Sequence, residues 1–254
     1  MKLSLFQLDC HDPHWDDALS PDSLPKLLAS AKQCDLAVFP ETMPFYEEKP
    51  PITHAKAVAA LEEASRQVPH VAFIAGGYVK DGTETRNRAY LVRAGAVLDS
   101  YDKQIKWQGE TFDPGNTIKK FTWGRFGVIP LICADAGDDL GPRKVRMMSE
   151  ALAAGAGPKV PIVVCSYGGG LTTDFWHIPL DEWSRGCEAP VVICGVAGEH
   201  DTETYKDVGG VYRPFGGGGS GAFWPDGELV QHTKRGRLQL DLEKRSLVWH
   251  KLPK

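Results

Sequence analysis

Three residues that could carry out covalent chemistry each come at the end of an apolar run. Cys133 follows residues 128–132, Glu41 follows residues 36–40, and Lys103 ends a third such run. A cysteine at the carboxyl end of a buried strand lies where α/β proteins place nucleophiles, and backbone N–H groups at such a turn could hold an oxyanion. Cys133 is also explained as a small residue of the core, because unpaired cysteine is often buried.

These three residue types would suit acyl transfer if the fold brings them together. A carboxylate such as Glu41 could take the proton of the Cys133 thiol, since the thiolate is the reactive form. An ammonium such as Lys103 could stabilise the negative oxygen formed when the thiolate attacks a carbonyl or nitrile carbon. Taken singly, Glu41 could equally cap a helix, and Lys103 could be a solvated charge at a strand end.

The composition indicates a folded α/β protein. The chain has 254 residues, of which 42% are hydrophobic and 24% are charged, with a net charge of −4. No cluster of Lys and Arg and no long apolar stretch is present, so we expect neither a nucleic-acid partner nor a membrane partner. The six cysteines are dispersed without a CxxC pair, which predicts no zinc site and no disulfide scaffold and favours a cytoplasmic location.

Hydrophobic periodicity predicts the elements that must position these residues. Alternating strands and helices early in the chain, with hairpins in between and late, predict α/β layers with a mixed sheet. The strand at residues 71–75 is expected to end at Gly76-Gly77, and a later helix is expected to begin at Pro179. Strands are predicted at residues 3–8, 36–39, 71–75, 89–92, 96–101, 128–132, 162–165, 191–195, 222–224, 229–230, 238–242 and 247–249, and helices at 24–31, 55–67, 143–153 and 179–188.

Four segments match, in order and spacing, the motifs of one enzyme family. They are residues 35–42 (DLAVFPET), 101–103 (YDK), 109–115 (GETFDPG) and 127–135 (GVIPLICAD). They resemble the glutamate, lysine, second-glutamate and cysteine motifs of the nitrilase superfamily of carbon–nitrogen hydrolases. Weaker similarities at residues 175–188 and 219–228 extend the resemblance over most of the chain.

The resemblance implies a fold and an assembly. The expected fold is a four-layer α-β-β-α sandwich of two mixed sheets flanked by helices, forming a single carbon–nitrogen hydrolase domain over residues 1–254. Members commonly pair two sandwiches through helices near the active site, so a homodimer or a larger homo-oligomer is expected. The family chemistry requires no cofactor and no metal.

The resemblance also implies a role for each site residue. Glu41 would be the general base, Lys103 and the backbone N–H of Ala134 would bind the oxyanion, and Cys133 would be the nucleophile. Glu110 would position the substrate or the lysine. Two tryptophans, Trp107 and Trp176, are candidates to line the substrate pocket, although large aromatic residues are more often part of a core.

Asp135 could either cap the helix that follows it or buttress the cysteine turn. Residues 216–219 are four glycines, which form either a flexible loop or a backbone that approaches a ligand closely.

Departures from the family pattern concern the substrate. Ala134 replaces the aromatic residue that often follows the cysteine, and Ile105 stands where a histidine is often found. Nitrile-cleaving members typically carry tryptophan and glutamate after the cysteine and have longer chains, so a small-molecule amide or carbamoyl amine is the expected substrate. The alternatives are an acyltransferase that passes the acyl group to an amine, a nitrile hydrolase, and a non-catalytic interaction protein.

Overall fold

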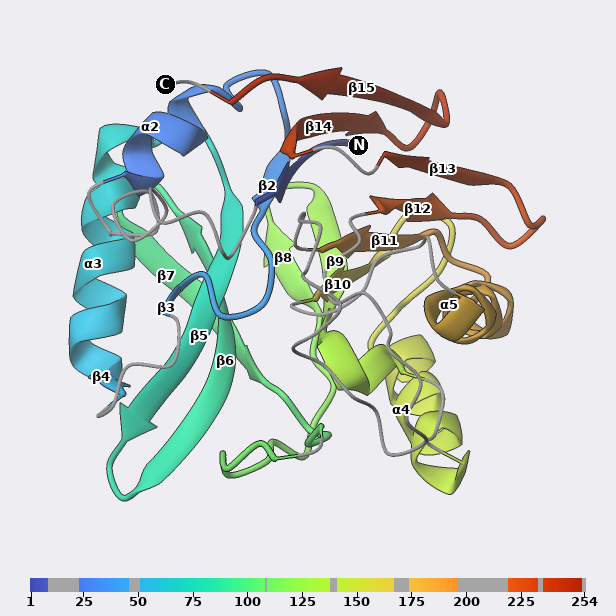
Figure 1. The fold of residues 1–254 in the computed structure, drawn as a ribbon, viewed down its shortest axis with the longest axis horizontal. Helices are drawn as coiled ribbons and strands as arrows, with labels where there is room; N and C mark the ends of the chain where they lie inside the picture. The colour runs from blue at the N-terminus through green and yellow to red at the C-terminus, as the bar shows by residue number, and fades with distance from the viewer. Residues whose placement is uncertain are drawn as a thin grey trace, which may run out of the picture.

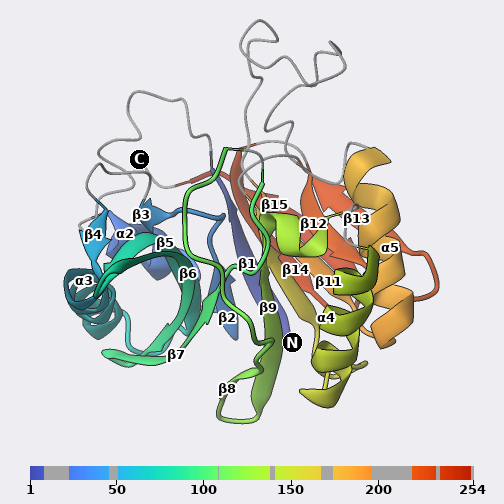
Figure 2. The ribbon, with the colours of Figure 1, turned by 90° about the horizontal axis from the view of Figure 1, so that it is seen from below.

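Two mixed β-sheets lie face to face and helices cover their outer faces, which confirms the four-layer α-β-β-α sandwich (Figures 1 and 2). The computed structural model describes residues 1–8, 23–45, 51–107, 109–137, 141–166, 174–195, 219–232 and 235–252, with the backbone alone for 174–178. On the outside of the first sheet lie α2 (Leu24–Ala29) and α3 (His54–Gln67). On the outside of the second lie α4 (Gly141–Ala153) and α5 (Asp174–Cys187).

The first sheet has nine strands and contains both ends of the described chain. Its main path runs β15-β14-β1-β2-β5-β6-β7, and β3 and β4 also pair with β5. Strand β1 runs parallel to β2 and antiparallel to β14, which makes the sheet mixed. The strands are β1 (Lys2–Gln7), β2 (Leu36–Val38), β3 (Pro44–Phe45), β4 (Ile52–Thr53), β5 (Phe73–Asp81), β6 (Glu84–Arg93), β7 (Ala96–Asp102), β14 (Gly236–Asp241) and β15 (Ser246–His250).

The second sheet has six strands in the order β13-β12-β11-β10-β9-β8. Strands β9, β10 and β11 are parallel, as expected for a region in which helices connect the strands, and the remaining pairs are antiparallel. The strands are β8 (Phe121–Trp123), β9 (Phe126–Ile132), β10 (Ile162–Cys165), β11 (Val191–Cys194), β12 (Ser220–Phe223) and β13 (Leu229–His232).

Strand β2, near the middle of the first sheet, is apolar on both faces because both faces are covered there. In β2, Leu36 and Val38 belong to the core between the sheets, whereas Ala37 and the following Phe39 belong to the core beneath α2 and α3. Helix α3 contributes Leu61 to the second of these cores, on the same face as its other buried residues. The period of two along the strand therefore separates the two layers of core.

Strands β3, β4 and β8 are not expected from the sequence, and several boundaries differ from the expectation, two of them for a clear physical reason. Strand β5 does not end at Gly76-Gly77 but continues to Asp81, because these glycines allow neighbouring strands to approach closely. A Cβ at Gly77 would lie 2.0 Å from the Phe45 carbonyl oxygen of β3. Helix α5 begins at Asp174 and contains Pro179 in its interior. Proline favours the first turn of a helix, so the sequence predicts that the helix begins at Pro179. The observed helix begins five residues earlier, at Asp174.

No helix among the described segments is long and apolar enough to span a membrane.

Candidate active site

Glu41 lies in a break between two strands that both pair with β5. Strand β2 pairs with β5 up to Val38, and β3 resumes the parallel pairing at Pro44. Between them the chain leaves the ladder, and Thr42 takes a left-handed φ of 63°. Although the chain leaves the ladder here, the side chain of Glu41 remains buried. This interruption of the ladder lets Glu41 leave the edge of β5 and reach its partners across the first sheet.

Lys103 joins the two glutamates that the sequence singles out. It follows β7, and its Nζ lies 2.7 Å from Glu41 Oε1 and 2.7 Å from Glu110 Oε1. The side chains of Lys103 and Glu41 are only 1% and 2% exposed, so their charges compensate each other away from water. Burial alone would lower the pKa of Lys103, but the negative charges of Glu41 and Glu110 raise it well above its usual value. Lys103 is therefore an ammonium at neutral pH.

Cys133 enters the site from the second sheet. Strand β9 ends at Ile132, and Cys133 begins a single 3-10 turn that runs to Ala136. The φ of Cys133 is 43°, in the left-handed region that side chains other than glycine rarely occupy. A residue held in this conformation costs about 1–3 kcal/mol, and such residues cluster at functional sites. The Ser166 hydroxyl, at the end of β10, donates to Cys133 Sγ at 3.9 Å.

The electrostatics of the site keep the free thiol protonated. Burial raises the pKa of Cys133 to about 12, assisted by the charge of Glu41 and by a hydrogen bond to it, whereas Lys103 opposes the shift. Thiol, carboxylate and ammonium therefore share one site, and the carboxylate lies where it could accept the thiol proton. The structure thus brings together Glu41, Lys103, Cys133 and Glu110 from four separate segments.

Two polar residues that the sequence analysis did not select complete this network. Asn87 donates its side-chain amide to Glu41 Oε1 at 2.8 Å, the same oxygen that Lys103 contacts. The Tyr78 hydroxyl donates to Glu110 Oε1 at 2.9 Å. Tyr78 and Asn87 are direct partners in the register of β5 and β6.

A usable signal for Asn87 and Tyr78 exists in the sequence. Asn87 continues the inward-facing series of Ala89 and Leu91 on β6, and Tyr78 continues that of Ile74 on β5. Side chains two apart on a strand share one face. Asn87 and Tyr78 are therefore polar side chains on strand faces that are otherwise apolar, and this pattern identifies them as candidate functional residues.

Asp135 buttresses the cysteine turn, which is one of the two alternatives that the sequence leaves open. It is fully buried, and its carboxylate accepts four hydrogen bonds. Three of the donors are backbone N–H groups and the fourth is the Tyr101 hydroxyl. Burial raises the pKa of Asp135 to about 7, against the opposing effects of Lys103 and of these donors.

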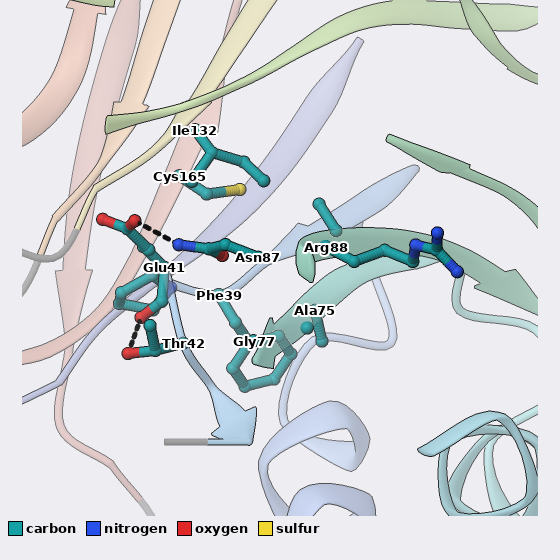
Figure 3. A pocket seen from close by; sticks show the side chains of 12 residues that line it. Phe39, Glu41, Thr42, Ala75, Gly77, Asn87, Arg88, Ile132 and Cys165 are labelled. Atoms are coloured by element: carbon teal, nitrogen blue, oxygen red, sulfur yellow. Dashed lines mark hydrogen bonds between the residues drawn. The ribbon is translucent and has the colours of Figure 1, made fainter. Parts of the chain in front are cut away.

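A small hollow opens beside Glu41 (Figure 3). In Figure 3, the carboxylate of Glu41 points toward Asn87, while Thr42 and Cys165 lie around the same hollow. Neither Cys133 nor Lys103 is among its lining residues. The hollow therefore borders Glu41 but is not lined by the Cys133 thiol or by the Lys103 ammonium.

The remaining candidates are only partly placed. The backbone N–H of Trp107 donates to Glu110 Oε2 at 2.5 Å, and its side chain is exposed. Ala134 lies in the cysteine turn, where its carbonyl accepts from Gly137. The side chain of Trp176 and residues 216–218 lie outside the described part of the structure. Within that part, no group of three His, Cys, Asp or Glu side chains is arranged to hold a metal ion.

Comparison with known proteins identifies the fold. No family model and no curated protein matches the sequence. A cysteine-to-alanine mutant of the Nesterenkonia AN1 amidase from the nitrilase superfamily superposes with a TM-score of 0.71 at 20% identity, covering 96% of this chain and 93% of that chain. Saccharomyces cerevisiae Nit3, a member of branch 10 of the superfamily, gives 0.67 at 17% identity, with 95% and 89% covered.

A larger protein contains a similar fold. Glutamine-dependent NAD+ synthetase from Acinetobacter baumannii gives a TM-score of 0.67 at 16% identity, covering all of this chain (100%) and 47% of that chain. The chain therefore has the fold of the nitrilase superfamily, as the motif resemblance predicts.

Proposed function

We propose that this protein is a nitrilase-superfamily hydrolase that cleaves the carbon–nitrogen bond of a small amide or carbamoyl amine through a Cys133 thioester. The observation that carries the proposal is the convergence of Glu41, Lys103, Glu110 and Cys133 at one buried site. A non-catalytic protein would gain little from this arrangement, because a buried ion pair next to a strained turn contributes weakly to stability.

The first half of the reaction forms the thioester. Glu41 takes the proton of Cys133 as sulfur attacks the carbonyl carbon, and the electron pair of the C=O bond moves to oxygen. Lys103 and the backbone N–H of Ala134 donate to this oxyanion. When the oxyanion collapses, the C–N bond breaks and Glu41 returns the proton to the leaving nitrogen. The products are an amine or ammonia and an acyl group on Cys133.

The second half restores the enzyme. Glu41 takes a proton from water, whose oxygen attacks the thioester carbon, and Lys103 again stabilises the oxyanion. Collapse releases the carboxylic acid and the thiolate of Cys133, which regains a proton. Glu110 holds Lys103 through both carboxylate oxygens, at 2.7 and 2.9 Å, so that the ammonium keeps its place while its partners change.

Chemistry seen in a structural neighbour supports this proposal. A glutamate-to-glutamine mutant of the Nesterenkonia AN1 amidase carries the acetamide moiety of fluoroacetamide at its active-site cysteine. That protein matches this chain with a TM-score of 0.69 at 21% identity. By analogy with that adduct, we expect Cys133 of the present chain to form an adduct on sulfur.

Intact-mass measurement tests the proposal directly. The protein is mixed with a panel of carboxamides and carbamoyl amines, and Glu41→Gln is included because slower thioester hydrolysis should let the acyl-enzyme accumulate. We expect a mass increase equal to the acyl group, located on Cys133 by peptide mapping. Cys133→Ala should give no adduct, and Cys165→Ala, which removes a different buried thiol, should give the same adduct as the natural protein.

The roles of the two charges are separable with an activated ester, whose good leaving group needs little acid assistance. Glu41→Gln should recover part of its acylation rate with this substrate, whereas Lys103→Met should not, because the oxyanion still needs its donor. Equal recovery of both variants would contradict the assignment. An adduct that disappears only when an amine is added would instead indicate an acyltransferase.

A further inference from the structure

The Asp135 carboxylate connects three segments that are distant in sequence. Its Oδ1 accepts from the backbone N–H groups of Gln104 and Ile105, each at 2.9 Å. Its Oδ2 accepts from the backbone N–H of Ile132 at 3.1 Å and from the Tyr101 hydroxyl at 2.8 Å. Asp135 itself is 0% exposed, so none of these bonds is exchanged with water in the resting structure.

The two oxygens serve different parts of the catalytic machinery. Oδ1 holds the backbone directly after Lys103, which carries the ammonium of the site. Oδ2 holds the residue directly before Cys133, at the point where β9 passes into the turn. The Asp135 carboxyl group therefore bridges the backbone next to Lys103 and the backbone next to Cys133.

The cysteine turn needs such a contact because its backbone conformation is unfavourable. The left-handed φ of Cys133 would relax if the surrounding structure did not fix it. Lys103 comes from the first sheet and Cys133 from the second, so no shared strand sets the separation of ammonium and sulfur. Within the described segments, the Asp135 bonds to residues 104, 105 and 132 join the two backbones beside both residues.

We propose that Asp135 is a positioning residue, which sets the place of the Cys133 turn relative to the Lys103 segment and so aligns sulfur with the oxyanion donor. This inference rests on the proposed thioester chemistry. Asp135 touches no reacting atom in that mechanism and acts through the backbone on either side of it. Its loss should lower the rate of the chemical steps while leaving substrate affinity nearly unchanged.

The geometry predicts an unequal effect of substitution at Asp135. In Asp135→Asn, the amide oxygen could keep the two bonds near Lys103. The NH₂ group would then face the Ile132 N–H, which cannot accept, whereas the Tyr101 hydroxyl could turn and accept from it. The cysteine turn would lose its contact while the lysine segment keeps its own. Asp135→Ala would release both. Tyr101→Phe removes the hydroxyl and leaves the bond between Oδ2 and the Ile132 N–H in place.

The test compares Asp135→Asn, Tyr101→Phe and the double variant, with Ser184→Ala as a matched control. Ser184 is buried and donates to the Ala189 carbonyl at 2.7 Å, away from the cysteine turn. Turnover is divided by the fraction of sites that form the acyl adduct. We expect Asp135→Asn to lower kcat by about 10²-fold with KM nearly unchanged, the effect of a small misplacement of reacting groups.

Each of the other variants has its own expected result. Tyr101→Phe should lower kcat less than Asp135→Asn, because it leaves the Ile132 bond in place, and the double variant should lose at least as much kcat as Asp135→Asn. Ser184→Ala should lower thermal stability without lowering kcat. Amide exchange, which needs no substrate, should accelerate at residue 132 but not at residues 104 and 105 in Asp135→Asn, and at all three in Asp135→Ala.

Wild-type kcat per active site in Asp135→Asn would overturn the inference. It would also be overturned if Ser184→Ala lost kcat in the same proportion to its loss of thermal stability as Asp135→Asn does. If Asp135→Asn does not fold, Tyr101→Phe decides, and an unchanged kcat in that variant counts against positioning. A different result would show that the proposed function itself is wrong: the natural protein would then form no acyl adduct with any of the amides.

Discussion

The two sheets supply the candidate site in contrasting ways. The first sheet contributes charged groups, and in it Lys103 is enclosed by Glu41 and Glu110, which are in turn held by Asn87 and Tyr78. The second sheet contributes one neutral thiol on a turn of unfavourable backbone conformation. The first part is organised by charge compensation, and the second by the hydrogen bonds that fix its backbone.

The difference indicates which kind of change each side tolerates. On the first sheet, removal of one charge leaves its partner buried and uncompensated, so that stability and activity are lost together. On the second sheet, removal of the thiol costs little stability, because the strain there belongs to the backbone. Activity and stability should therefore separate at Cys133 and stay coupled at Lys103.

The largest effect on activity is expected at Cys133. Both Cys133→Ala and Cys133→Gly remove the nucleophile and should reduce turnover to the uncatalysed level. Glycine adopts a left-handed φ without the penalty of a side chain, so Cys133→Gly should be more stable than Cys133→Ala by about 0.5–1 kcal/mol. Urea denaturation of the two variants measures this difference. Residual turnover in either purified variant would refute the nucleophile assignment, and equal stabilities would refute the strain argument.

Lys103→Met should combine a large loss of activity with a large loss of stability. The substitution keeps the length of the side chain but leaves Glu41 and Glu110 facing each other without a cation. The free energy of unfolding should fall by about 3–5 kcal/mol, the usual effect of breaking a buried ion pair. Adding Glu41→Gln and Glu110→Gln should restore much of it. Denaturation of the single and triple variants provides the comparison, and no recovery in the triple variant would contradict it.

Glu41→Gln should slow turnover by about 10²–10⁴-fold and yet make the thiol more acidic. Burial, the charge of Glu41 and its hydrogen bond raise the pKa of Cys133 to about 12, so removal of the charge should lower that pKa. The thiolate fraction at pH 8 should rise, and iodoacetamide should label Cys133 faster in the variant. Rates from pH 7 to 10 provide the measurement. Slower labelling would mean that Glu41 stabilises the thiolate instead of suppressing it.

The smallest effect is expected at Tyr78. Tyr78→Phe removes one hydrogen bond to Glu110, which still contacts Lys103 through both oxygens and accepts from the backbone N–H of Trp107. We expect a fall in stability of about 1 kcal/mol and a decrease in kcat of less than tenfold. Thermal denaturation measures the change in stability, and steady-state kinetics measures the change in kcat. A loss as large as that of Lys103→Met would show that Tyr78 has a further part in the reaction.

Much of this contrast is predictable from the sequence, but not all of it. Apolar periodicity predicts helices α2 to α5 and most of the strands, but not the short strands β3, β4 and β8. The motifs around Glu41, Lys103, Glu110 and Cys133 predict the residues that meet. These signals are local, because each depends on residue types within a short segment. The sequence does not predict that β5 continues past its two glycines, since that depends on the close approach of β3.

The supporting residues are harder to predict because their roles depend on long-range pairing. Asn87 and Tyr78 become neighbours only through the register of β5 and β6. The choice between the two roles of Asp135 depends on the Lys103 segment, about 30 residues earlier in the chain, which the fold brings to it. A sequence pattern within one strand can mark Asn87 and Tyr78 as polar residues on a buried face, but it does not say which distant groups they contact.

The placement of the proposed catalytic groups on opposite sheets would link their chemistry to the thermodynamics of folding. In the proposed mechanism, the acyl group of the thioester is bonded to sulfur on one layer, while its oxygen contacts the ammonium of Lys103 on the other. Any ligand state that contacts both layers of the folded protein, and has no counterpart in the unfolded chain, raises the free energy of unfolding. The acyl-enzyme of that mechanism would therefore hold the two layers together, and its hydrolysis would return the free energy of unfolding to the lower value of the resting protein.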